Sequence, residues 1–516
     1  MLRIAIALVA LAACGQPGRS TLPVPPAPPL FASIPADTPY VVASFQAVPL
    51  EYWQKIQAAV APIVERAMVE RPQSPVVAAI AAELAGKWNA AGLASLGINP
   101  SPRFAVYGLG LEPVVARVEI ADEQALLATI QRIASRAGLT LPPQHTLGGR
   151  GYWRFDSGDG TMVIALADKQ LVVAYGKPAR IDATLPLVLG AEKPARNMAD
   201  GSQLAAVIER DGMGPEMVGY VDTRKLVDEI GAAFGPAPAD CMTAIDQLAG
   251  RVPGIAVGYR EISARRLVGG VVVELAPDLR RALASAKRDV PGLDAVLAGD
   301  PVFAMGGGMS LDAMRALGQR AAEAIAGVGE VCHAPVRKLH EIADRLAEKL
   351  PAPLDQITGG AMAVEALDMA GDKPRAFDGF SLVAAGSAPA LYAELVRELP
   401  MLGKLGIAAD GTLHEIAAPF PLPFPLQLYA GVGPHALVIA AGPRSHDIAQ
   451  RALAGHAAKA PLFVASYDYP RLFALAAALS PVGSETDAFT RMLGRATMTM
   501  DIDDRGLAIW SDIELR

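Results

Sequence analysis

Residues 151–176 read GYWRFDSGDGTMVIALADKQLVVAYG, and their pattern is the clearest indication of fold class in the chain. Three runs rich in β-branched and aromatic residues are separated by SGDG and ADKQ, two clusters of turn-forming residues. The stretch therefore predicts three consecutive antiparallel strands. Two further segments predict hairpins of the same kind: GIAVGYREISARRLVGGVVVEL at residues 254–275 and ATMTMDIDDRGLAIWSDIEL at residues 496–515.

Segments with helical spacing lie between these strands. In residues 122–138, DEQALLATIQRIASRAG, the positions of Ala125, Leu126, Ile130 and Ile133 recur at helical intervals. Neighbouring hairpins favour an antiparallel sheet over a doubly wound parallel one. The predicted fold class is therefore α+β, with a mainly antiparallel sheet that alanine-rich helices cover on one face.

The chain also contains an internal repeat. ALLATIQR at residues 125–132 matches ALYAELVR at residues 390–397 with an offset of 265 residues. LVVA at residues 171–174 then matches LVIA at residues 437–440 with an offset of 266. Two separate matches at nearly the same spacing indicate two tandem copies of one unit.

Later matches have a shorter offset. VGYVDTRKL, which contains Asp222, matches VASYDYPRL, which contains Asp468, at an offset of 246, and the GR dipeptides at Gly250 and Gly494 match at 244. An additional segment in the first copy, around residues 189–203, would explain the drop. The alternative is a chance alternation of alanine-rich helices with valine-rich strands.

These matches define the predicted domain boundaries. The first α+β unit covers residues 36–277, the second covers residues 298–516, and residues 278–297 connect them. At 516 residues the chain is long enough for two such units, each with a substantial core.

The first residues have the pattern of an export signal. Met1-Leu2-Arg3 provides a positive charge, and the following apolar run, residues 4–11, is too short to span a membrane. Leu11-Ala12-Ala13-Cys14-Gly15 resembles the lipobox of bacterial lipoproteins. The resemblance implies that residues 1–13 are a cleaved signal peptide and that the Cys14 thiol receives a diacylglyceryl group. The alternative is an ordinary signal peptide in which Cys14 is incidental.

The same resemblance implies a location. Gly15 stands where an aspartate would, in enterobacterial relatives, favour retention in the inner membrane. We therefore expect an anchor in the outer membrane, with the protein facing the periplasm. Residues 14–35 are rich in proline and predict an extended tether, which could hold the body up to about 65 Å from the bilayer.

The two other cysteines, Cys241 and Cys332, would meet oxidising conditions in an exported protein. If they are paired, they join the end of the first unit to the start of the second. The alternative is two buried free thiols.

A segment with proline at every second position, APFPLPFPLQLY at residues 418–429, stands out in the second unit. In an extended chain the prolines would remove N–H donors from one edge, which is typical of an edge strand protected against further pairing. A second interpretation is an apolar flap that contacts a partner or an acyl chain through the opposite side-chain face. That face would carry Phe420, Leu422, Phe424 and Leu426.

Composition and motifs argue against several functions. The net charge is −7 and no long basic stripe is present, so nucleic acid is a poor candidate partner. His340 and Asp344 share a helical face but lack a third metal ligand, so we predict no metal site. The glycines at residues 306–308 match neither phosphate-loop nor dinucleotide motifs, so no cofactor is expected. Instead they predict a permissive turn, after which Ser310 caps a helix.

The sequence therefore predicts a non-catalytic, acyl-anchored envelope lipoprotein that binds a partner or supports assembly. The body loosely resembles uncharacterised bacterial envelope proteins with duplicated strand–helix units. A lipid or lipoprotein carrier with an apolar cavity is the alternative, motivated by the 52% hydrophobic content. A hydrolase is a third class, but the sequence contains no G-x-S-x-G nucleophile motif.

Overall fold

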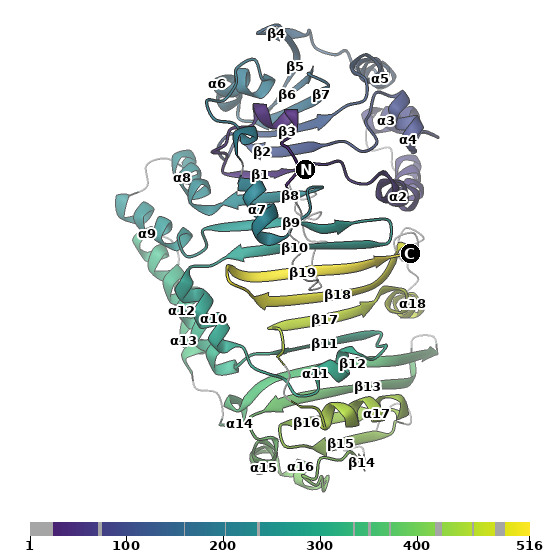
Figure 1. The fold of residues 1–516 in the computed structure, drawn as a ribbon, viewed down its shortest axis with the longest axis vertical. Helices are drawn as coiled ribbons and strands as arrows, with labels where there is room; N and C mark the ends of the chain where they lie inside the picture. Colours follow the sequence, from purple (N-terminus) through teal and green to yellow (C-terminus); the bar gives the residue numbers. More distant parts are fainter. Residues whose placement is uncertain are drawn as a thin grey trace.

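The computed structural model of the protein is an α+β fold built on one long antiparallel sheet (Figure 1). It describes residues 24–70, 75–158, 160–201, 203–234, 238–333, 336–348, 352–370, 373–417, 426–456, 459–479 and 491–516. Within these residues nineteen strands form a single sheet, and neighbouring strands are antiparallel. The predicted α+β class and the mainly antiparallel sheet are confirmed.

The first half of the chain contributes ten of the described strands. They are β1 (Tyr40–Ala43), β2 (Phe104–Gly108), β3 (Val114–Glu119), β4 (His145–Leu147), β5 (Arg150–Ser157), β6 (Gly160–Ala167), β7 (Gln170–Gly176), β8 (Val218–Asp222), β9 (Gly254–Ile262) and β10 (Arg266–Glu274). Their order across the sheet is β4-β5-β6-β7-β3-β2-β1-β8-β9-β10.

The second half contributes the other nine described strands. They are β11 (Phe303–Gly308), β12 (Ile357–Ala370), β13 (Lys373–Ala385), β14 (His414–Ile416), β15 (Leu428–Val432), β16 (Ala436–Ala441), β17 (Phe463–Asp468), β18 (Leu493–Ile502) and β19 (Gly506–Leu515). Their order is β14-β15-β16-β13-β12-β11-β17-β18-β19. Strand β10 then pairs with β19 over nine residues of each strand, so the two halves share one sheet.

Helices lie between the strands of both halves. The first half contains η1 (Pro29–Ser33), α2 (Leu50–Glu70), α3 (Pro75–Leu84), α4 (Ala90–Ser95), α5 (Glu123–Arg136), α6 (Pro178–Leu189), η2 (Met198–Asp200), α7 (Gln203–Asp211), α8 (Thr223–Phe234) and α9 (Ala239–Ala249). The second contains α10 (Pro277–Ala286), α11 (Leu293–Leu297), α12 (Leu311–Val331), α13 (Arg337–Ala347), α14 (Ala352–Asp355), α15 (Ala388–Glu398), α16 (Pro400–Gly403), α17 (Pro443–Leu453) and α18 (Tyr469–Leu479).

One face of the sheet carries the two main cores. In the first half, residues of α6, α7 and η1 pack on the inward side chains of β1–β3 and β6–β8. In the second half, residues of α11 and α17 pack on β11–β13 and β16. Figure 1 shows α7, α11 and α17 in front of the strands on the side facing the viewer. We call this the covered face.

The opposite face is covered only in part by the helices described. Tyr52, Trp53 and Ile56 of α2 pack near the centre of the sheet, against side chains that include Tyr259 and Ile513. The predicted connecting segment, residues 278–297, contains α11, whose Leu293 and Val296 belong to the second core.

The three strands predicted from residues 151–176 are β5, β6 and β7, paired in order. The turn between β6 and β7 places Asp168 and Lys169 at φ angles of 55° and 59°. Two successive residues in the left-handed region are typical of the tight hairpin turns whose twist matches that of the strands. The local sequence therefore accounts for this meander.

A buried cation marks the first core. Arg117 of β3 is 1% exposed, and the closest of its hydrogen bonds, at 2.7 Å, runs from Nη2 to the carbonyl oxygen of Val188. Its other donors reach the hydroxyl of Tyr107 at 3.2 Å and Oε1 of Gln170 at 3.1 Å. Val188 lies in the last turn of α6, where carbonyl groups form the negative end of the helix dipole. Neutral polar groups thus stabilise this charge.

Candidate binding site

The sheet face opposite the covered face has an apolar surface over β3, β6 and β7. Side chains along these strands alternate between buried and partly exposed, but both sets are largely apolar. An antiparallel sheet with one solvated face normally alternates apolar and polar residues. We call this surface the open face; in the first half it consists of Val114, Ala116, Val118, Met162, Ile164, Leu166, Leu171, Val173 and Tyr175.

The second half presents the same kind of surface. Ile439 of β16 pairs with Ser381 of β13, which pairs with Met362 of β12, and all three lie on the open face. The side chain of Ile439 is 60% exposed and that of Tyr175 in the first half is 58% exposed. Large exposed apolar residues grouped on one face are typical of a surface that binds a partner or an apolar ligand.

The open face of the second half also contains a hollow of about 420 Å³ where β11 and β12 meet the start of α12. Glycines create the space: Gly307 and Gly360 pair with each other on neighbouring strands. A Cβ atom on Gly307 would lie 2.1 Å from the carbonyl oxygen of Leu462, so this position requires glycine. The lining is Met305, Gly306, Gly307, Met309, Leu311, Met314, Ile357, Gly359, Gly360, Ala361, Met362, Ser381, Leu382, Leu462 and Phe463.

The chemistry of this hollow suits an apolar ligand. Four of the described lining side chains are methionines, which are flexible and polarisable and adapt to ligands of different shape. None of the lining residues described is charged. The volume falls within the usual range for small-molecule sites, although the hollow is open on one side. We call it the methionine hollow.

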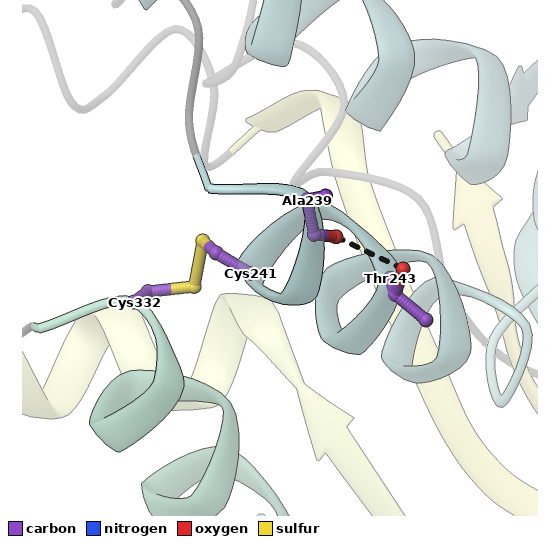
Figure 2. Close-up of a disulfide and its surroundings, with 4 residues drawn as sticks. All are labelled: Ala239, Cys241, Thr243 and Cys332. Atoms are coloured by element: carbon purple, nitrogen blue, oxygen red, sulfur yellow. Dashed lines mark hydrogen bonds between the residues drawn. A yellow bond between two sulfur atoms is a disulfide. The ribbon is translucent and has the colours of Figure 1, made fainter.

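Cys241 and Cys332 form a disulfide in the structure, with their Cα atoms 4.8 Å apart (Figure 2). Cys241 lies in the first turn of α9 and Cys332 is the C-cap of α12. Figure 2 also shows Thr243 of α9 donating its hydroxyl hydrogen to the carbonyl oxygen of Ala239, at 2.9 Å. The bridge therefore links helices of the two halves.

Four of the other predicted site residues, Cys14, Phe420, Leu422 and Phe424, lie outside the described residues. Leu426 is described; it is partly buried and comes two residues before β15. The edge-strand and flap interpretations of residues 418–429 therefore stay predictions.

The residues considered for metal or phosphate binding have other surroundings. Nε2 of His340 lies 2.9 Å from Oε1 of Glu330, and no group of three or more potential metal ligands occurs among the described residues. Ser310 caps α12, as predicted, by accepting a hydrogen bond from the backbone N–H of Ala313 at 3.3 Å. The expectation of a glycine turn before it was wrong, because residues 306–308 belong to strand β11.

Comparisons with known proteins add no relative. The chain matches no family model, no curated protein and no solved structure. In the part of the chain that the structure describes, no helix combines the length and the apolar character needed to span a membrane.

Sequence reasoning did not identify the methionine hollow. Its lining comes mainly from β11, β12, β13 and α12, together with Leu462 and the first residue of β17. One signal was present: methionines recur at Met305, Met309 and Met314, in a segment that also contains three consecutive glycines. Combining bulky flexible residues with glycines on neighbouring strands leaves space between side chains, but the sequence does not state which strands are neighbours.

Proposed function

We propose that this protein is an exported lipoprotein that acylated Cys14 fixes to the membrane, and that its body is a non-catalytic binding or assembly module of the cell envelope. The lipobox pattern and the proline-rich tether support the anchor. We place it in the outer membrane, facing the periplasm, on the resemblance stated above. Two copies of one α+β unit make up the body in this proposal.

The strand order supports the duplication. In the first half β1 pairs with β2 and β8, β3 pairs with β2 and β7, and β8 pairs with β9. In the second half β11 pairs with β12 and β17, β13 pairs with β12 and β16, and β17 pairs with β18. Each strand of one set thus has a counterpart with the same neighbours.

Strand register supports it further. Ala116 pairs with Val173 in the first half, and Ser381 pairs with Ile439 in the second. Ser381 lies 265 residues after Ala116 and Ile439 lies 266 residues after Val173, which are the offsets of the sequence matches. Likewise, Asp222 and Asp468 each accept a hydrogen bond, at 3.1 Å, from the backbone N–H of the residue three positions later. Between α6 and β8 the first copy has η2 and α7, and no described helix lies between α17 and β17, so the additional segment extends beyond residues 189–203.

One sequence match does not fit the register. Val218 of β8 and Val464 of β17 are counterparts at the offset of 246. Val218 pairs with Gly258 of β9 and Val464 pairs with Thr499 of β18, so these two partners are counterparts at an offset of 241. The GR dipeptides at Gly250 and Gly494 were matched at an offset of 244. They are therefore not counterparts in the duplication that we propose.

The pair between β10 and β19 has the symmetry expected of two copies. Gly270 pairs with Gly258 and Trp510 pairs with Thr499, so Gly270 and Trp510 are counterparts, and they also pair with each other. A two-fold axis brings equivalent residues opposite one another. A Cβ atom on Gly270 would lie 2.5 Å from the Trp510 ring, so one position must be small where its counterpart is large.

The observation that carries the binding function is the exposed apolar open face in both halves. We propose that this face contacts an apolar surface of another envelope protein. A tether of about 65 Å leaves the body free to reach such a partner without resting on the bilayer.

Photocrosslinking in living cells tests this contact. We expect p-benzoylphenylalanine at Tyr175 or at Ile439 to give a discrete crosslinked product. Leu139 is the matched control because it is 53% exposed but lies just after α5, outside the sheet. No product at either sheet position, or the same products at Leu139, would contradict a binding role for the open face.

The methionine hollow favours the second candidate, a lipid or lipoprotein carrier. Under that proposal Ser381→Phe, which places a large side chain in the lining, should weaken binding of a fluorescent fatty acid at least tenfold. Ala116→Phe, at the corresponding strand position of the first half, should leave binding unchanged. Equal affinity of all three proteins for the fatty acid, or no binding by the parent protein, would remove the carrier proposal.

A further inference from the structure

A second cavity lies on a different part of the second half. It has a volume of about 750 Å³ and lies at the end of the β12–β13 hairpin, beside α18. The lining is Val302, Ala366, Leu367, Asp368, Met369, Arg375, Ala376, Arg444, Arg471, Ala474 and Leu475. We call it the arginine pocket, because three of its lining residues are arginines.

The three arginines come from three separate elements. Arg375 lies on β13, Arg444 on α17 and Arg471 on α18. The guanidinium groups of Arg375 and Arg444 are exposed, and no carboxylate of the described residues pairs with either of them. Their charges are therefore available to a ligand.

Arg471 is held in place by the protein itself. Its guanidinium donates to the carbonyl oxygen of Asp300 at 2.7 Å and to that of Glu365 at 2.6 Å. Its Nη1 also lies 3.4 Å from Oδ2 of Asp300, so the two side chains form an ion pair. Its backbone N–H is bonded to the side chain of Asp468 at 3.1 Å. This preorganises one positive charge at the wall of the pocket.

The nearby carboxyl groups cancel only part of the pocket's positive charge, because Asp300 pairs with Arg471 but no described carboxylate pairs with the other two arginines. Asp378 is occupied, because it accepts a hydrogen bond from the backbone N–H of Arg444 at 2.9 Å. Glu365 is 8% exposed and its Oε1 has no hydrogen-bond partner. Burial raises the pKa of Glu365, so this carboxyl group is less readily ionised than an exposed one. Asp368 is the acidic residue in the lining described.

The first half keeps one of these three charges, because Lys225 corresponds to Arg471 in the match of Asp222 with Asp468. Its β2–β3 hairpin ends at Gly108 and Val114 and has no counterpart of Arg375. Helices α6 and α17 both begin with proline, so Ala179 corresponds to Arg444. The pocket thus belongs to one half, which is what a ligand site acquired after a duplication would look like.

We propose that the arginine pocket binds a phosphate monoester attached to an apolar group. Guanidinium groups bind phosphate oxygens in a bidentate manner, and a monoester carries more negative charge than a carboxylate, which suits several cations. Leu367, Met369 and Leu475 provide apolar contacts for the substituent. The proposal concerns a site distinct from the open face and does not depend on what that face binds.

Calorimetry on the full mature protein, in phosphatidylcholine nanodiscs with empty discs as the blank, tests the proposal. The probes are dihexanoyl phosphatidic acid, dihexanoyl phosphatidylcholine and inorganic phosphate. We expect phosphatidic acid to bind at one site, at least tenfold more tightly than either other probe. Arg375→Gln and Arg444→Gln should each weaken its binding about tenfold, the effect of losing one charge-assisted hydrogen bond.

The control is Arg180→Gln, which removes an exposed arginine of α6 and should leave binding unchanged. An unchanged thermal midpoint of each variant shows that it is folded. The proposal is overturned if the Arg375→Gln and Arg444→Gln proteins bind like the parent, or if phosphatidylcholine binds as tightly as phosphatidic acid. Equal affinity for inorganic phosphate would overturn the apolar part and identify a free phosphate as the ligand.

Discussion

Replacing Cys14 with serine should move the protein almost completely from the membrane fraction to the soluble fraction. Each methylene group buried in a bilayer contributes about 0.8 kcal/mol, and stable anchoring needs at least two acyl chains. A serine hydroxyl cannot receive the thioether-linked diacylglyceryl group that the lipobox resemblance implies. The described helices offer no membrane span that could replace it. Fractionation at high salt followed by immunoblotting measures the change.

The matched control for this experiment is the double variant Cys241→Ser and Cys332→Ser. It also removes thiols but leaves the lipobox intact, so it should stay in the membrane fraction. A Cys14→Ser protein that fractionates with membranes as the parent does would contradict the anchor. The envelope function proposed above would then lose its basis.

Reducing the Cys241–Cys332 disulfide should lower the free energy of unfolding by about 4.6 kcal/mol in the chain-entropy model. The bridge closes a loop across a sequence separation of 91 residues, and long loops lose the most conformational entropy in the unfolded chain. It also joins α9 to the end of α12, and these two helices are neighbours in the structure (Figure 1). Guanidinium unfolding with and without reductant measures the difference.

The double serine variant is again the control, because its unfolding midpoint should not respond to reductant. Peptide mapping without reduction should recover the peptides of Cys241 and Cys332 joined together. If both cysteines of the folded, unreduced protein react with an alkylating agent, the bridge does not exist in solution.

The sequence predicted local structure well. Strands β5, β6 and β7 could be read from residues 151–176, because alternating apolar runs and turn residues act over a few positions. Helix α5 begins after Asp122, whose side chain accepts from the backbone N–H of Ala125 at 2.6 Å. Such local signals do not depend on the rest of the chain.

Long-range pairing could not be predicted in the same way. The β10–β19 pair joins residues about 240 positions apart. Nothing in the sequence of the β9–β10 hairpin specifies that β10 will pair with β19 of the β18–β19 hairpin. Arg117 is a second example. The sequence around it, PVVARVEI, does not indicate that the arginine is buried, because the groups that accept its hydrogen bonds belong to β2, β7 and α6.

The candidate sites were missed for the same reason. The arginine pocket combines residues 375, 444 and 471, whose separation along the chain hides their proximity. The methionine hollow depends on two glycines that face each other across neighbouring strands. For the disulfide, the sequence indicated a possible pairing, because only two cysteines remain once Cys14 is assigned to the anchor, but it left two free thiols as the alternative.

The mass of the intact mature protein tests the central claim, the acyl anchor on Cys14, most directly. We expect a chain that begins at Cys14 and carries the added mass of two or three acyl chains on that residue. A mature chain with no acyl groups, or one cleaved at another position, would contradict the claim.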